Sequence, residues 1–213
     1  MEPKEKQVLT PKQKRSIATK DKIKTVAKRL FSEKGYYTVT SNKIASEASV
    51  PIGSFYNYYR NKEEILLELI RDFEAAYQKL TFGPFRKLVD TISRKEDIPV
   101  SLSKILQLYV LNKHLADPFF KVYHALQFTE PKVLALAAEL RRVELGIIEY
   151  LLEKMSEFEP FTNTPEKVKL IHSLCENLAL YIHHLGTPIP PTDLIDEASR
   201  MIYAQVTLQS DSD

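Results

Sequence analysis

The sequence predicts an all-α protein with two domains, and three observations support that prediction. Apolar residues recur at helical spacing, as in Ile23, Ala27 and Leu30, and no extended run alternates with the period of a strand. Residues that start helices, such as threonine, asparagine and proline, precede most of these periodic segments. Charge divides the chain: residues 1–62 carry 14 Lys and Arg against 5 Asp and Glu, whereas residues 63–213 carry 16 against 23.

The composition indicates a protein with a substantial core and no membrane segment. The chain has 213 residues, 44% of them apolar, and no apolar run approaches the roughly 20 residues that span a bilayer. The charged N-terminus lacks the apolar block of a signal peptide. Cys175 is the single cysteine, which fits a reducing compartment. We therefore expect a cytoplasmic protein. The excess of positive charge in residues 1–62 predicts a polyanionic partner for that part of the chain. The alternative is that these residues form a merely solvated tail.

Two helices are expected first, after an arm at residues 1–16 whose composition predicts disorder. The apolar stripe predicts a helix from Thr19, and Gly35 ends it where glycine commonly closes a helix. Thr40 is a good N-cap for the second helix, whose inward side is apolar. Ser49 and the residue after it break this helix, so the next one must begin after a short turn.

Two further helices complete the basic part of the chain. Pro51 stands where a helix tolerates proline and opens a third helix through about Tyr58. Asn61 caps a fourth helix, with Glu64 three residues on as its capping-box partner. Apolar residues at helical spacing carry this fourth helix to about Leu80.

The acidic part of the chain predicts five more helices. Gly83-Pro84 and residues 93–99 are expected to interrupt the chain before them. Threonine or aspartate followed by proline marks several starts, and Gly186 ends the fourth of these helices. The expected spans are about 99–115, 117–128, 130–157, 164–185 and 192–209.

The second and third helices are joined by a turn too short for an antiparallel hairpin, so they should cross steeply. This is the layout of a helix-turn-helix, whose second helix enters the major groove of DNA. Such a helix needs small residues at its tip so that the backbone can approach the bases. Pro51, Ile52, Gly53 and Ser54 satisfy that requirement.

An ordered run of residues in the first third of the chain carries a family resemblance. The run consists of Ala27, Leu30, Phe31, Gly35, Tyr36, Thr40, Ile44, Ala45, Ala48, Val50, Gly53, Phe55, Tyr56, Tyr59, Lys62 and Glu63. Residues 23–66 thereby resemble the DNA-binding domain of TetR-family transcriptional regulators. The resemblance implies an N-terminal three-helix helix-turn-helix DNA-binding domain and a C-terminal helical ligand-binding and dimerisation domain. The implied boundaries are 1–16 for the basic arm, 17–78 for the DNA-binding domain, with its helix-turn-helix at about 40–59, and 79–213 for the effector domain.

The resemblance also implies roles for single positions in contact with double-stranded DNA. Phosphates would be held by Thr40 with Ser41 and Asn42 beside it, and by Tyr56 and Lys62. Base edges would lie nearest Ile52, Gly53 and Ser54, followed by Asn57 and Tyr58, and Pro51 is a further DNA-binding position. Phe55 and Tyr59 would pack inward. Two positions depart from the family pattern: Ser49 stands where glycine is usual in the turn, and Pro51 replaces the commoner serine.

An effector pocket is expected in the C-terminal domain, with aromatic walls that suit an apolar or flat small molecule. The candidates are Tyr109, Phe119, Phe120, Tyr123, His124, Phe128, Tyr150 and Tyr181. Leu136 is a further possible wall residue. The alternative interpretation is that these side chains form an ordinary core.

No metal site and no cofactor are predicted. His172, Cys175 and Glu176 share one face of a helix, with His183 and His184 two turns on, but a single helix supplies too few ligands for a closed site. We expect a homodimer through the helices at about 164–185 and 192–209, whose apolar stripes could pack against a twin. The alternative is that both stripes pack within one chain.

These features predict a dimeric transcriptional regulator, most simply a repressor that a small effector releases from its operator. A sequence-nonspecific architectural DNA-binding protein is the alternative, and the acidic second part argues against it. An enzyme is not expected, because the chain has no nucleophile elbow, no phosphate-binding loop and no complete metal signature.

Overall fold

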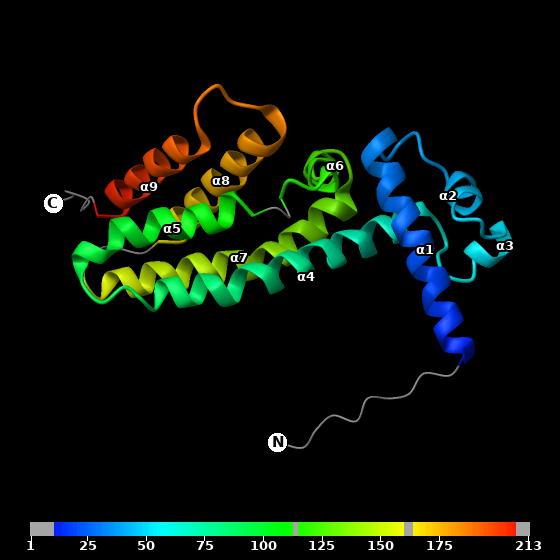
Figure 1. The fold of residues 1–213 in the computed structure, drawn as a ribbon, viewed down its shortest axis with the longest axis horizontal. Coiled ribbons are helices and arrows are strands. Elements are labelled where there is room, and N and C mark those ends of the chain that lie inside the picture. Colours follow the sequence, from blue (N-terminus) through cyan, green and yellow to red (C-terminus); the bar gives the residue numbers. More distant parts are fainter. Residues whose placement is uncertain (1–10, 113–114, 160–163, 208–213) are drawn as a thin grey trace, which may run out of the picture. The chain divides into compact units, whose positions relative to one another are not determined.

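The computed structural model describes residues 11–112, 115–159 and 164–207, and every regular element within them is helical (Figure 1). The predicted all-α fold is confirmed. The chain divides into two compact units, and the boundary falls between Arg71 and Asp72. The elements are α1 (Pro11–Lys34), α2 (Ser41–Glu47), α3 (Ile52–Phe55), α4 (Lys62–Val89), η1 (Lys95–Asp97), α5 (Ile98–Val110), α6 (Pro118–Leu126), α7 (Pro131–Ser156), α8 (Pro165–Leu180), η2 (Tyr181–Leu185) and α9 (Pro191–Thr207).

The first unit forms a small core from α1, α2, α3 and the start of α4. The stripe predicted on α1 is fully buried except for Val26, which is half-buried, and Ile44 of α2, Phe55 of α3 and Ile65 of α4 are fully buried as well. Helix α1 begins at Pro11, eight residues before the expected start, so the prediction of disorder fails for residues 11–16. The rest of the predicted arm, residues 1–10, lies outside the described residues.

Helix α4 continues through Gly83-Pro84, where the sequence predicted an interruption. Proline removes the N–H that would reach the carbonyl of Leu80, and both Leu80 and Pro84 are exposed, so water can take its place. Beyond the proline, Phe85 and Val89 are buried. Burial of these two side chains offsets the lost hydrogen bond, and the helix ends at Val89 instead of near Leu80.

The second unit contains the rest of α4 and the helices from α5 onward. Helix α5 packs on α8 and α9, while α7 packs on α6 and α8. Helix α8 turns into the π-helical stretch η2, which Gly186 closes at a φ of 81°. There His183 and His184 donate to the carbonyl oxygens of Val110 and Leu115, at 2.7 and 2.8 Å. No helix in the described ranges is long and apolar enough to cross a membrane.

Candidate nucleic-acid interface and effector cavity

The turn between α2 and α3 has the geometry of a helix-turn-helix. The Thr40 hydroxyl oxygen accepts from the backbone N–H of Lys43 at 3.2 Å and caps α2. At the other end of α2, the Val50 N–H donates to the carbonyl of Ala45, and Ser49 adopts a φ of 53°. This is the left-handed position that glycine usually fills, and a serine there costs about 1 kcal/mol.

Helix α3 has one buried side and one exposed side. Phe55 is fully buried and Tyr59, just beyond the helix, is 3% exposed, with ring centroids 6.2 Å apart. Both inward placements are as predicted. The predicted base-reading and phosphate-binding positions lie on the other side. Pro51, Ile52, Gly53, Tyr56 and Asn57 are exposed, whereas Ser54 and Tyr58 are half-buried.

Lys62 lies at the start of α4 but is engaged with the loop that precedes α2. Its Nζ donates to the carbonyl oxygens of Tyr36 at 2.7 Å and Val39 at 2.8 Å, and it lies 4.3 Å from the centroid of the Tyr36 ring. Charged donors form the stronger hydrogen bonds, so this lysine fixes the loop that positions Thr40. These contacts differ from the phosphate contact that the family resemblance implies for Lys62.

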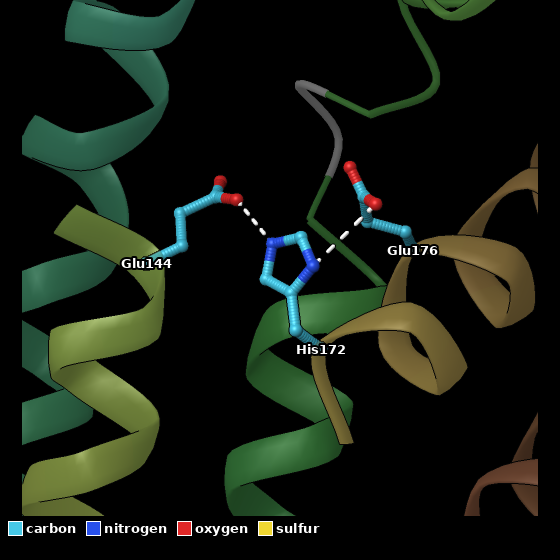
Figure 2. Close-up of side chains that lie close together, drawn as sticks. All are labelled: Glu144, His172 and Glu176. Carbon is cyan, nitrogen blue, oxygen red and sulfur yellow. Dashed lines mark hydrogen bonds and ion pairs between the residues drawn. The ribbon is translucent and has the colours of Figure 1, made fainter. Parts of the chain in front are cut away.

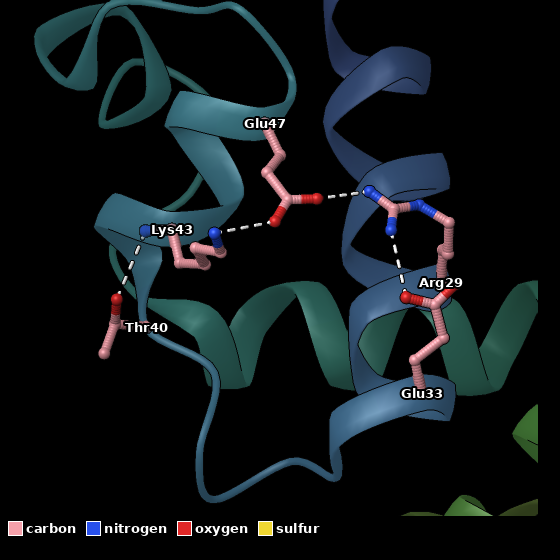
Figure 3. A network of polar contacts seen from close by, with 5 residues as sticks. All are labelled: Arg29, Glu33, Thr40, Lys43 and Glu47. Carbon is pink, nitrogen blue, oxygen red and sulfur yellow. Dashed lines mark hydrogen bonds and ion pairs between the residues drawn. The ribbon is translucent and has the colours of Figure 1, made fainter.

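An ion-pair network connects α1 with α2 in the same unit (Figure 3). Glu47 accepts from Lys43 on its own helix, at 2.9 Å, and from Arg29 on α1, whose guanidinium also reaches Glu33 at 3.0 Å. The hydrogen bonds from Lys43 and Arg29 lower the pKa of Glu47 to about 2. Glu47 therefore stays ionised at any pH near neutrality, and the side chains fix the relative position of α1 and α2.

A cavity lies inside the second unit, among α4, α5, α7, α8 and α9. Its volume is about 50 Å³, room for a few water molecules. Aliphatic residues such as Leu102, Ile105 and Leu151 form half of its wall. Tyr77 and Tyr109 add two phenols, whose ring centroids are 5.8 Å apart in an edge-to-face arrangement. Burial raises the pKa of both phenols, so they remain neutral.

The carboxyl group of Glu144 and the imidazole of His172 also stand in this largely apolar wall. His172 on α8 is 2% exposed, and Figure 2 shows its ring between the carboxylates of Glu144 on α7 and Glu176 on α8. Nε2 of the imidazole is 2.6 Å from Glu144 Oε2, and Nδ1 is 3.5 Å from Glu176 Oε2. A contact between an imidazole and a carboxyl group thus connects α8 with α7 beside the cavity.

Glu74 on α4 adds a third carboxyl group to this cluster and is 8% exposed. Its burial, together with the negative charges of Glu144 and Glu176, raises its pKa to about 8. The Glu74 side chain therefore carries a proton at neutral pH, and the Tyr123 hydroxyl is its hydrogen-bonding partner. Burial likewise raises the pKa of Cys175 in the cavity wall to about 12, so this thiol is not a nucleophile.

Glu144, His172 and Glu176 could in principle bind a metal ion, because their ligand atoms lie within 4.8 Å of one another. The ring, however, turns a different nitrogen to each carboxylate. A metal ion takes one imidazole nitrogen, so a common site for the three groups would need one carboxylate to cross to the other side of the ring. The geometry favours a histidine held between two acids over a metal centre.

The eight residues predicted for the effector pocket are not gathered in one place. Tyr109 lines the cavity. Phe119, Phe120 and Tyr123 are buried and pack around Phe73, an arrangement that matches the alternative of an ordinary core. His124 is half-buried with its ring 6.0 Å from that of Phe120, and Phe128, whose ring is 5.6 Å from His124, is 80% exposed. Tyr150 is hydrogen-bonded to Asp90, and Tyr181 is 40% exposed.

Sequence reasoning did not select Glu74 or Glu144 as site residues, although a signal was present. Each carboxylate interrupts an apolar stripe at helical spacing. Glu74 falls between Ile70 and Tyr77, and Glu144 falls before Ile148 and Leu151. A charge inside such a stripe is costly to bury, so it marks a candidate functional position.

Comparisons with known proteins agree with this geometry. Residues 23–69 match the family described as bacterial regulatory proteins, tetR family. The HTH-type transcriptional regulator HbdR of Aromatoleum sp. strain CIB is 40% identical over 57 residues, which cover 27% of this chain and only a quarter of HbdR. The nucleoid occlusion factor SlmA of Pasteurella multocida is 29% identical over 154 residues, covering 69% of this chain and 73% of SlmA.

Solved structures share the fold over nearly the whole chain. A transcriptional regulator from Saccharomonospora viridis, crystallised in complex with choline, superposes with a TM-score of 0.66 over 91% of this chain and all of its own, at 17% identity. The first unit thus has the geometry of a helix-turn-helix, and the second unit is a separate helical domain. Residues 23–69 are therefore similar to the DNA-binding part of TetR-family transcriptional regulators, and the fold of the described residues agrees with that similarity.

Proposed function

We propose that this protein is a ligand-responsive, dimeric repressor that a small apolar or aromatic effector releases from its DNA operator. One observation carries the proposal. Helix α3 exposes Ile52 and Gly53 on one side while Phe55 anchors the other side in the core. A helix held in this way has a fixed direction and a free surface, which a recognition helix requires.

The DNA contacts follow from which groups are exposed. Ile52, Gly53, Ser54 and Asn57 would face base edges, with Pro51 and Tyr58 at the margins. Thr40 uses its oxygen as a cap acceptor, so its hydroxyl hydrogen is available to a phosphate, with Ser41, Asn42 and Tyr56 nearby. Lys62 would contribute chiefly through the loop that it fixes. Since Asn57 is the best bidentate donor in this set, we expect base methyl contacts and DNA shape to contribute to recognition.

A homodimer would form mainly through α8 and η2. Leu170 and Leu185 are 65% and 64% exposed, and Tyr181 lies between them at helical spacing on the same face. Helix α9 contributes differently from the prediction, because its stripe at Ile195 and Ile202 is buried within this chain, where α9 packs on α5. Its exposed Met201 would lie at the dimer contact instead. Residues 208–209 of the predicted contact lie outside the described residues.

The effector would act from the cavity among α4, α5, α7, α8 and α9. Its present volume suits only a few waters, so a ligand must favour a conformation in which these helices separate. Helix α4 takes part in both units, and a shift of this helix is the simplest way to change the spacing of two recognition helices in a dimer.

Selection of binding sites from genomic DNA with the purified protein tests this function. We expect enrichment of a two-fold symmetric site, bound at least about a thousandfold tighter than random DNA at equal salt. The variant Asn57→Ala should lose affinity for that site, while Lys87→Ala, an exposed position of the second unit, should not. Equal, salt-sensitive binding to all sequences would instead favour the architectural alternative.

A further inference from the structure

We infer that the cavity of the second unit selects a hydrophobic organic cation, such as an amine or a quaternary ammonium ion, through the carboxylate of Glu144. The inference rests on the proposed function, because it names the chemical class of the effector that this cavity would take. It concerns the charge of the ligand, which the shape and apolarity of the wall do not determine.

The wall of the cavity combines three features that together suit a cation with an apolar body. Aliphatic side chains such as Ile105 and Leu151 would surround the apolar part. The rings of Tyr77 and Tyr109 present π-systems, which attract an ammonium group. Glu144 supplies the one carboxylate among the residues that line the cavity, and no lysine or arginine is among them.

The pair of Glu144 and His172 is difficult to explain as a stabilising device. Moving two ionisable groups out of water costs more than a well-packed apolar pair would, so a buried ion pair is weak evidence for stability. Both groups border the cavity and lie 2.6 Å apart. In the absence of a ligand, the imidazole N–H satisfies the carboxylate. A ligand ammonium offers Glu144 a stronger partner, so it would compete with His172 for the same oxygen.

The surrounding carboxyl groups exclude an anion. Glu176 lies 3.5 Å from the second nitrogen of His172, and Glu74 belongs to the same buried cluster. Arg141 on α7 is the opposing charge nearby, but its guanidinium donates to Gln127 at 3.0 Å and does not line the cavity. A carboxylate ligand would therefore meet the carboxylate of Glu144 in a wall that has no lysine or arginine, and this repulsion is costly in an apolar site.

Three probes of nearly equal shape test the charge selectivity by calorimetry or ligand-observed NMR. They are phenyltrimethylammonium, its neutral isostere tert-butylbenzene, and 4-tert-butylbenzoate. We expect the wild type to bind the cation at least about tenfold tighter than the neutral isostere, and the benzoate more weakly than either. Equal or tighter binding of the neutral probe or the benzoate, or no binding of any of the three, overturns the inference.

The variant Glu144→Gln assigns the selectivity to this carboxylate. Its amide oxygen can still accept from His172, and we expect it to bind the cation about tenfold more weakly while binding tert-butylbenzene like the wild type. The unchanged neutral probe shows that the cavity remains folded. Glu149→Gln is the matched control, because Glu149 is exposed on the same helix and should leave all three affinities unchanged. An unchanged cation affinity in Glu144→Gln overturns the assignment.

The same probes added to the protein–operator complex separate this inference from the proposed function. Release of the operator by the cation alone supports both. Selective binding of the cation without release leaves the charge selectivity standing and contradicts the switch. Release by the neutral probe at the same occupancy as by the cation supports a ligand-responsive regulator and contradicts cation selection.

Discussion

The two units place their polar groups in opposite ways. In the first unit, apolar anchors such as Phe55 hold a short helix so that Ile52, Tyr56 and Asn57 face solvent. In the second unit, Glu74 and His172 are buried and Glu144 is half-buried, and the last two line a largely apolar cavity. A polar surface for DNA costs little stability, whereas a buried charged cluster carries a desolvation cost. Substitutions should therefore separate function from stability in the first unit and couple the two in the second.

The largest expected contrast is between two adjacent residues of the first unit. Phe55→Ala removes a fully buried ring and should lower the free energy of unfolding of this unit by about 3–5 kcal/mol. Tyr56→Ala removes a side chain that is 53% exposed and should change it by less than about 0.5 kcal/mol while weakening operator binding. Denaturant unfolding and DNA titration of both variants measure this contrast. A strongly destabilised Tyr56→Ala would contradict the division into anchor and contact residues.

The second expected effect is a pH-dependent stability caused by Glu74. In the unfolded chain this carboxyl loses its proton near its ordinary pKa of 4.5, whereas in the folded protein it keeps the proton up to about pH 8. The unfolded state therefore gains stability as pH rises through this window, and the wild type becomes less stable relative to Glu74→Gln. The difference should grow by about 1.4 kcal/mol per pH unit between pH 5 and 8.

Denaturant midpoints of the wild type and Glu74→Gln at pH 5, 6, 7 and 8 test this. Glu144, Glu176 and His172 are present in both proteins, so their titration largely cancels in the difference. The amide oxygen of the glutamine can still accept from the Tyr123 hydroxyl. A constant difference across the four pH values would show that Glu74 is ionised in the folded protein. The charge cluster would then be open to solvent, unlike the cavity described above.

The same contrast explains which parts of the molecule could be predicted from sequence. The helix-turn-helix is a local arrangement: its cap at Thr40, its turn at Ser49 and its anchors at Phe55 and Tyr59 lie within 20 residues, so spacing alone relates them. The cavity brings together residues from α4, α7 and α8 that are far apart in the chain. The choice of pocket residues from sequence relied on aromatic content. It therefore selected Phe119 and Phe120, which pack around Phe73, and missed Glu74 and Glu144.

The helix boundaries show a similar limit. Thr40, Asp117 and Thr164 cap their helices as predicted, because a cap depends on neighbours two or three residues away. Pro84 was predicted to interrupt a helix that in fact continues, because the burial of Phe85 and Val89 depends on packing that the local sequence does not contain. Tertiary contacts decided this case.

A third, smaller effect is expected from a substitution of Lys62, because this lysine fixes the loop that positions Thr40, the cap of α2. Lys62→Met removes the charged donor from the carbonyls of Tyr36 and Val39 and should cost about 1–2 kcal/mol. Operator affinity should fall with it, because Thr40 follows this loop directly. Lys34→Met is the control, since Lys34 is exposed at the end of α1. An effect on affinity but none on stability would indicate that Lys62 contacts a phosphate, as the family resemblance implies.

The smallest expected effect on stability comes from alanine substitutions at two glycines. These substitutions separate an effect on DNA binding from an effect on folding. A Cβ added at Gly53 or at Gly146 meets no atom within 4 Å, and neither residue has a positive φ. Alanine at either helical position should therefore raise the free energy of unfolding slightly, by up to about 1 kcal/mol. Only Gly53→Ala should weaken operator binding, by about tenfold, because the added methyl group would stand between α3 and the bases. If both variants bind the operator like the wild type, α3 does not approach the bases closely, and the exposed face of the first unit would contact chiefly the phosphate backbone.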